Sequence, residues 1–131
     1  MEKHRNRIVL GLGSNYHKEE NMAEAKRLLA HRFPSLCFSE DELTEPVGSS
    51  LPMDCFLNCV ALGTTEEELS VVQRGLKEME RSLGRTPEEK ALGHIAIDID
   101  LLQWNDLQLK PADLTCDYIQ RGLSSLLTDK T

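Results

Sequence analysis

The feature that most restricts the fold is the alternation of residue types over positions 95–102. Isoleucine or leucine stands at every second position from Ile95 to Leu101, and Asp98 and Asp100 fall between them. Because successive side chains of a strand point to opposite faces, the segment predicts a strand with one apolar face. That face must be buried against another layer. The two aspartates share the other face, about 6.5 Å apart at their Cα atoms.

The rest of the chain indicates three more strands and three helices. Apolar runs predict strands at 7–13, 36–44 and 55–63, before the fourth at 95–104. Helices are expected at 18–33, from the Thr65/Glu68 capping-box pattern to Leu83, and at about 117–127. Residues 85–94 are expected to form a polar loop and Asn105-Asp106 a turn. The order β-α-β-β-α-β predicts an α+β, ferredoxin-like fold, with two helices on one face of an antiparallel sheet and a short C-terminal tail.

Composition restricts the class of protein. The 131 residues suit a single domain over 1–131, and 40% hydrophobic with 28% charged residues is typical of globular proteins. The net charge of -7 argues against a nucleic-acid partner. No apolar run suggests a membrane span or a signal peptide, and the four cysteines lack a CxxC pair, so we expect free thiols in the cytoplasm. The sequence leaves the oligomeric state open, with a monomer favoured.

Asp98 and Asp100 have two interpretations. Aspartate is disfavoured in strands, so two on one face require a reason. One reason is a magnesium site, because Mg²⁺ prefers one or two carboxylates together with water and phosphate oxygens. The other is a sheet face that is simply open to water. Arg85, which follows the Gly84 helix cap, would either face the aspartates or stabilise the C-terminal end of the helix.

A second set of candidates lies on the third strand. Phe56 and Asn58 share one face of it, so the ring could stack on a heterocycle and the amide could bind the edge of that heterocycle. The alternative is a core asparagine beside a packed phenylalanine. The stretch Gly11–Asn15 lacks the spacing of a phosphate loop, and we interpret it as a strand-to-helix turn.

Taken together, the ordered motifs resemble one enzyme family. They are Gly-Leu-Gly-Ser-Asn at 11–15, Thr-Glu-Pro-Val-Gly at 44–48, Phe-Leu-Asn at 56–58, Glu80 with Gly84-Arg85, and Ile-Asp-Ile-Asp-Leu-Leu at 97–102. In this order, and over about residues 8–122, the chain is similar to the 6-hydroxymethyl-7,8-dihydropterin pyrophosphokinases of folate synthesis. The resemblance implies transfer of diphosphate from ATP to the pterin hydroxymethyl group, with release of AMP.

The resemblance also implies roles for individual residues. Asp98 and Asp100 would hold two magnesium ions between ATP and pterin, and Arg85 would steady the phosphates. The pterin pocket would be lined by Thr44, Val47, Phe56 and Asn58. ATP would be bound by Glu80, Leu101, Tyr118 and Arg121.

The chain departs from the family pattern on the ATP side. The family's loop after Gly-Arg is rich in arginine and usually has a tryptophan, whereas residues 86–92 read Thr-Pro-Glu-Glu-Lys-Ala-Leu. Ile95 stands where the family has an arginine, and the family's Pro-His-Tyr is reduced to Cys116-Asp117-Tyr118. An arginine at 95 would raise turnover if that side chain points at the phosphates. Two alternatives therefore stay open, namely a catalytically depleted relative that binds pterin or nucleotide, and a regulatory or interaction domain of the same fold.

Overall fold

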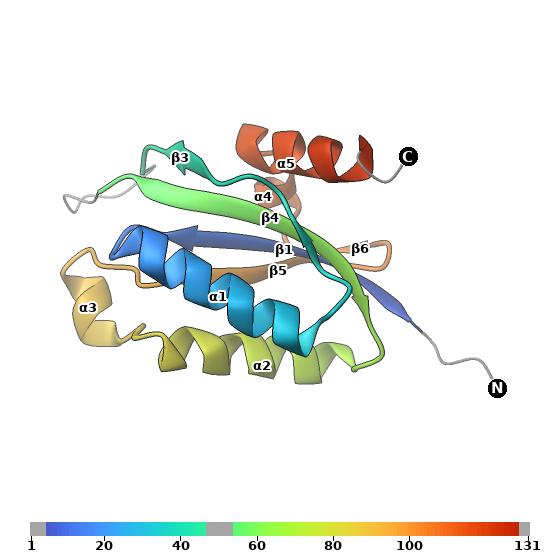
Figure 1. The fold of residues 1–131 in the computed structure, drawn as a ribbon, viewed down its shortest axis with the longest axis horizontal. Helices are drawn as coiled ribbons and strands as arrows, with labels where there is room; N and C mark the ends of the chain where they lie inside the picture. Colours follow the sequence, from blue (N-terminus) through green and yellow to red (C-terminus); the bar gives the residue numbers. More distant parts are fainter. Residues whose placement is uncertain (1–4, 47–53, 129–131) are drawn as a thin grey trace.

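A computed structural model describes residues 5–46 and 54–128, which form a six-stranded antiparallel sheet with helices packed on it (Figure 1). The strands are β1 (Asn6–Ser14), β2 (Cys37–Phe38), β3 (Glu42–Thr44), β4 (Phe56–Thr65), β5 (Asp98–Trp104) and β6 (Leu107–Gln108). The helices are α1 (Lys18–Arg32), α2 (Leu69–Ser82), α3 (Pro87–Ala91), α4 (Pro111–Leu114) and α5 (Asp117–Thr128). The predicted α+β, ferredoxin-like class is confirmed.

The register of the three long strands decides which side chains share a face. The strand order is β2-β4-β1-β5-β6, with β3 also paired to β4, so β1 runs between β4 and β5. Gly13 of β1 is paired with Asn58 on one side and with Asp98 on the other. Residues directly opposite in a ladder point to the same face. Asn58 and Asp98 therefore flank a position that has no side chain.

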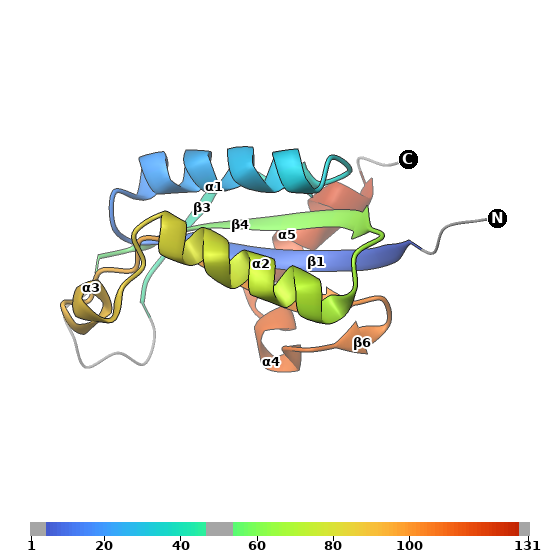
Figure 2. The same cartoon turned by 90° about the horizontal axis from the view of Figure 1, so that it is seen from below.

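Helices α1 and α2 cover one face of the sheet, as the alternation in 95–101 predicts (Figure 2). Ile8, Leu10 and Leu12 of β1 are at most 2% exposed and belong to one apolar cluster with Ile97 and Ile99. Residues of α1, its C-cap and α2 at steps of three and four pack into that cluster; they are Met22, Ala25, Leu29, Phe33, Val72 and Leu76. The buried isoleucine face leaves the aspartates on the opposite side of β5.

That opposite face is partly covered by the C-terminal helices α4 and α5. A separate apolar cluster there joins Val60 and Leu102 of the sheet to Leu114, Ile119 and Leu126. The sequence predicts the final helix, which is confirmed, but gives no sign that it packs on this face. Close packing depends on Gly122, because an added Cβ would lie 2.7 Å from Cγ2 of Val60.

Several boundaries differ from those predicted. The fourth strand begins at Asp98 and not at Ile95, because the backbone of Ile95 bonds to Asn15 and that of Ala96 to Ser14. The segment 36–44 divides into β2 and β3, and residues 107–108 form the additional strand β6 after the predicted turn, where Asn105 has φ 54°.

Two other local predictions are wrong. Gly11 and Gly13 lie inside β1 and not in a turn, since β1 continues to Ser14. The expected capping box is absent, because helix α2 begins at Leu69 after the N-cap Glu68, and the Thr65 hydroxyl accepts from the Glu67 amide instead.

The predicted polar loop 85–94 contains the short helix α3. The Thr86 hydroxyl caps it by accepting from the Glu89 amide, and Pro87 stands in its first turn, where a missing N–H costs nothing. Of the described helices, none is long and apolar enough to cross a membrane.

Candidate functional site

The two aspartates lie on the floor of a cavity of about 380 Å³ on the face shared with α5. The rest of its lining comes from β1, β4, the end of β3 with the two residues after it, and the C-terminal helices α4 and α5 with the residue Cys116 between them. Gly11 pairs with Asp100 and Gly13 with Asp98, so both glycines keep the floor open beside the carboxylates. An added Cβ at Gly13 would lie 3.2 Å from Oδ1 of Asn58, and the close approach accounts for glycine at this strand position.

Asn58 and Phe56 form the opposite wall of the cavity. Asn58 is 5% exposed, and its amide nitrogen donates to Oγ1 of Thr44 at 2.6 Å and, at 3.3 Å each, to the carbonyls of Glu42 and Phe56. These bonds fix the direction of the amide. Both residues therefore face one cavity, as the heterocycle hypothesis requires.

Each aspartate is paired with a cation. Nη1 of Arg85 donates to Oδ1 of Asp98 at 2.7 Å, and Nζ of Lys110 donates to Oδ1 of Asp100 at 3.1 Å. Burial favours a high pKa for Asp98, but the bond and charge of Arg85 outweigh it and hold that pKa below its ordinary value. Burial and the neighbouring charge of Asp98 raise the pKa of Asp100. The pair thus places two acidic groups of unlike environment side by side.

Glu80 supports this arrangement from α2. Its side chain is buried, and Oε2 accepts the Ile99 amide at 2.7 Å and lies 3.1 Å from Nη1 of Arg85. Burial raises the pKa of Glu80, and the Ile99 amide and Arg85 oppose that rise. A carboxylate on α2 therefore holds both the backbone of β5 and the arginine that pairs with Asp98.

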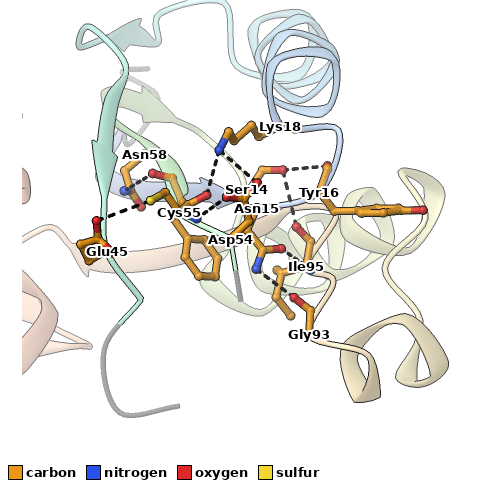
Figure 3. A network of polar contacts seen from close by, with 11 residues as sticks. Ser14, Asn15, Tyr16, Lys18, Glu45, Asp54, Cys55, Asn58, Gly93 and Ile95 are labelled. Atoms are coloured by element: carbon orange, nitrogen blue, oxygen red, sulfur yellow. Dashed lines mark hydrogen bonds and ion pairs between the residues drawn. The ribbon is translucent and has the colours of Figure 1, made fainter. Parts of the chain in front are cut away.

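A polar clamp holds the chain that leads into β5 (Figure 3). Asn15 accepts the Ile95 amide at Oδ1 over 2.6 Å and donates from Nδ2 to the Gly93 carbonyl over 2.9 Å. Ser14 donates to the Ala96 carbonyl at 2.6 Å. These side chains replace the ladder hydrogen bonds where β1 ends. They therefore fix the backbone just before β5, which begins at Asp98.

A groove of about 420 Å³ lies along α2 and β5 beside the cavity. Cations on its lining are Arg74, Lys77 and Lys110, and Asp100 and Leu101 of β5 also line it. Lys110 is paired with Asp100, and Lys77 lies 3.6 Å from Glu80. Three cations on one groove lining suit an anionic ligand such as a phosphate chain. Asp100 lines the cavity and the groove together, so it stands at their common boundary.

Comparison with known families shows which family the chain belongs to. Residues 9–123 match the family model of 7,8-dihydro-6-hydroxymethylpterin-pyrophosphokinase, abbreviated HPPK. The chain belongs to the HPPK family. No curated protein matches it. Membership places the chain among the pyrophosphoryl transferases of folate biosynthesis, and the resemblance inferred from the motifs is confirmed.

The residue chemistry fits a magnesium ion that arrives with phosphates. Within residues 5–46 and 54–128, no group of three or more His, Cys, Asp or Glu side chains could hold a metal by itself. Magnesium, however, is usually held by one or two carboxylates, with the remaining positions filled by water and substrate phosphate. Asp98 and Asp100 on the cavity floor meet that description, and Asp100 also lines the cationic groove.

The other candidates inferred for an HPPK fall in different places. Thr44 and Phe56 line the cavity, and Val47 lies outside the described residues. The side chain of Leu101 belongs to the apolar core, although the residue borders the groove. Arg121 forms an ion pair with Glu42 and lines a neighbouring cavity instead of the groove.

Tyr118 and Ile95 differ most from what the motifs suggest. Tyr118, inferred to contact ATP, lines the cavity with Phe56 and Asn58 and not the cationic groove. Ile95 is 8% exposed, and its backbone is bonded to Asn15. An arginine at residue 95 would raise turnover only if that side chain points at the phosphates, and this buried position does not support that condition.

Sequence reasoning missed Lys110, Asp113, Cys116 and the Ser14–Asn15 clamp. Lys110 is ten residues beyond Asp100 and reaches it because the β6 hairpin turns the chain back. No local pattern marks such a residue. The Gly-Leu-Gly-Ser-Asn motif was available as a signal for the clamp, but a turn explained its composition equally well.

Proposed function

We propose that this chain transfers diphosphate from ATP to 6-hydroxymethyl-7,8-dihydropterin and releases AMP, with magnesium as cofactor. The observation that supports it most is the position of Asp100, which lines both the cavity with Phe56 and Asn58 and the groove with Arg74 and Lys110. Two sites that share a carboxylate wall suit a reaction in which a phosphoryl group passes from one to the other.

The cavity suits a flat, amide-bearing heterocycle. Asn58 and Asp98 stand on either side of the Gly13 position, two strand spacings or about 9.5 Å apart, which leaves room for a bicyclic ring. Phe56 offers a face for stacking, and Oδ1 of the fixed Asn58 amide offers a hydrogen-bond acceptor beside Gly13, since the amide nitrogen already donates within the protein. The exocyclic hydroxymethyl group of the ring would then lie toward the aspartates.

The groove suits the triphosphate. Arg74, Lys77 and Lys110 would bind phosphate oxygens, and Arg85 would neutralise charge from the α2 side of Asp98. Asp98 and Asp100 would hold the magnesium ion, whose positive charge would offset the negative charge that develops on the phosphates. The hydroxymethyl oxygen forms a bond to the β-phosphorus and passes its proton to water. The bond from that phosphorus to the oxygen that bridges it to the α-phosphorus breaks, so that AMP departs.

The test is AMP formation from ATP, magnesium and 6-hydroxymethyl-7,8-dihydropterin. We expect the parent to form AMP and Asp100→Asn to lose about 100-fold or more of the rate, as is common when one charge-stabilising group is removed. Asp98→Ala and Asp100→Ala should likewise abolish magnesium-dependent activity and keep the fold, as followed by circular dichroism. An aspartate variant with full turnover would refute the metal assignment.

A catalytically depleted relative that binds pterin or nucleotide is the second candidate. It is favoured by Ile95, buried where the family has an arginine, and by Glu88 and Glu89 in the first turn of α3. Calorimetry separates the two. Binding of the pterin without AMP formation, over hours with ATP and magnesium, would support the second candidate and contradict the first.

A further inference from the structure

Tyr118 and Asn58 line two cavities at once. The first is the cavity with Asp98 and Phe56, and the second, of about 370 Å³, lies between α5 and the segment that contains β2 and β3. The second cavity is lined by Ser39, Val60 and Ser125 among others. These two shared side chains therefore form the boundary between a space proposed for a heterocycle and a space of similar size with no assigned role.

The two boundary residues differ in how they are held. Asn58 is bonded to Thr44 and to two carbonyls, and the proposed function needs its amide. Tyr118 stands on the first turn of α5, where its neighbours Ile119 and Gly122 pack on the sheet. Because that packing fixes the helix, shortening Tyr118 would open the boundary without allowing α5 to close over the gap.

The second cavity has an acidic lining. Glu40, Asp41 and Glu42 contribute three carboxylates, and Arg121 is the cation across from them. Arg121 is already paired with Glu42, and Asp41 accepts from Lys26 at 2.6 Å. A ligand substituent that reached this cavity would bind more favourably if it carried a positive charge.

The phenol also stays neutral in the working range. Burial, followed by the nearby Cys116 and acidic residues, raises the pKa of Tyr118 to about 12. A neutral ring on a fixed helix turn can exclude a substituent by its size, independently of pH.

We propose that Tyr118 sets the size limit of the heterocycle site. Its side chain separates the site from the acidic cavity and so excludes pterins that carry a substituent on the edge facing Asn58. If Asn58 binds the pterin amide, that edge carries the 2-amino group. The inference depends on the proposed function, since it assigns substrate selectivity to the same site. One additional group on a ligand that does not fit a pocket of this kind typically lowers its affinity by about 10-fold or more relative to the ligand without that group.

The experiment is calorimetry with two probes, 6-hydroxymethylpterin and its N2-(2-aminoethyl) derivative, on three proteins. The parent should bind the unsubstituted pterin at least about 10-fold more tightly. Tyr118→Ala should lose that preference through tighter binding of the aminoethyl compound. Tyr118→Phe, the matched control, keeps the ring and should keep the preference.

The outcomes separate this inference from the function on which it rests. If the parent binds neither probe, the heterocycle site itself is refuted, and the inference with it. If the parent binds the unsubstituted pterin and Tyr118→Ala keeps the preference, only the size limit is refuted. The size limit is also refuted if Tyr118→Phe loses the preference or if Tyr118→Ala no longer binds either probe. Should Tyr118→Ala not fold, Tyr118→Leu shortens the side chain with less loss of apolar contact and allows the same comparison.

Discussion

Arg85 donates a 2.7 Å hydrogen bond to Asp98 from the first residue after a left-handed glycine. Gly84 has φ 101° and ends the segment that follows α2, so the chain turns sharply and brings the guanidinium back over β5. The same nitrogen lies 3.1 Å from Glu80. One arginine thus neutralises a carboxylate of the candidate metal site and a buried carboxylate that supports it.

Arg85→Ala should weaken binding of magnesium-ATP. A charge-assisted hydrogen bond is worth about 2 kcal/mol, so we expect affinity to fall by about 10- to 100-fold. Arg85→Lys is the control, because it keeps the charge and loses the planar guanidinium. Its affinity for magnesium-ATP should lie between those of the parent and Arg85→Ala. Calorimetry with a nonhydrolysable ATP analogue measures both. Unchanged affinity in Arg85→Ala would mean that Arg85 serves only Asp98 and Glu80.

The aspartate pair was predictable, and so was Arg85 as one of its possible cations, whereas Lys110 was not. The alternation around Asp98 and Asp100 already places both on one face, because strand periodicity is local. Asn58 was predictable as a candidate for the same reason. Whether Asn58 and Asp98 share a face depends on register across β1, which no local pattern reveals. Lys110 depends in turn on the path of the β6 hairpin.

The start of β5 shows a different limit. Ile95 and Ile97 continue the alternation seen at Ile99, so periodicity extends the strand to residue 95. The ladder stops at Asp98 because β1 has ended and its last side chains take over the hydrogen bonds. Polar side chains that replace a ladder are a tertiary feature, and sequence alone distinguishes them poorly from turn residues.

Asn15→Ala should destabilise the protein by at least about 2 kcal/mol, because it leaves the buried Ile95 amide and Gly93 carbonyl without their partner. Asn15→Asp keeps the acceptor for Ile95 but sets a buried carboxylate against the Gly93 carbonyl, so its loss should be at least as large. Urea unfolding measures the free energy of both variants. A change below about 0.5 kcal/mol in Asn15→Ala would show that the clamp does not hold the start of β5.

Ile95→Arg should lose stability without gaining turnover. Ile95 is 8% exposed, and an unpaired charge placed there is expected to cost about 3 kcal/mol. Ile95→Leu, which conserves volume, should cost less than about 1.5 kcal/mol. Urea unfolding and AMP formation are measured on both variants. A stable Ile95→Arg with higher turnover would show that residue 95 reaches the phosphates after all.

The pH dependence of stability should carry the signature of Tyr118. Its pKa is raised from 10.0 to about 12, chiefly by burial, so the folded state favours the protonated phenol. A group with a raised folded pKa stabilises the fold fully below its unfolded value and loses that contribution as pH rises through the folded value. The parent should therefore lose stability relative to Tyr118→Phe between about pH 10 and about pH 12 and show no relative change below that window. Urea unfolding at about pH 9 and about pH 11 measures the difference, and tyrosinate absorbance that the parent shows in excess of Tyr118→Phe reports the ionisation itself. Excess absorbance that is already half complete at about pH 10 would place the phenol in water and remove the case for Tyr118 as a boundary between the two cavities.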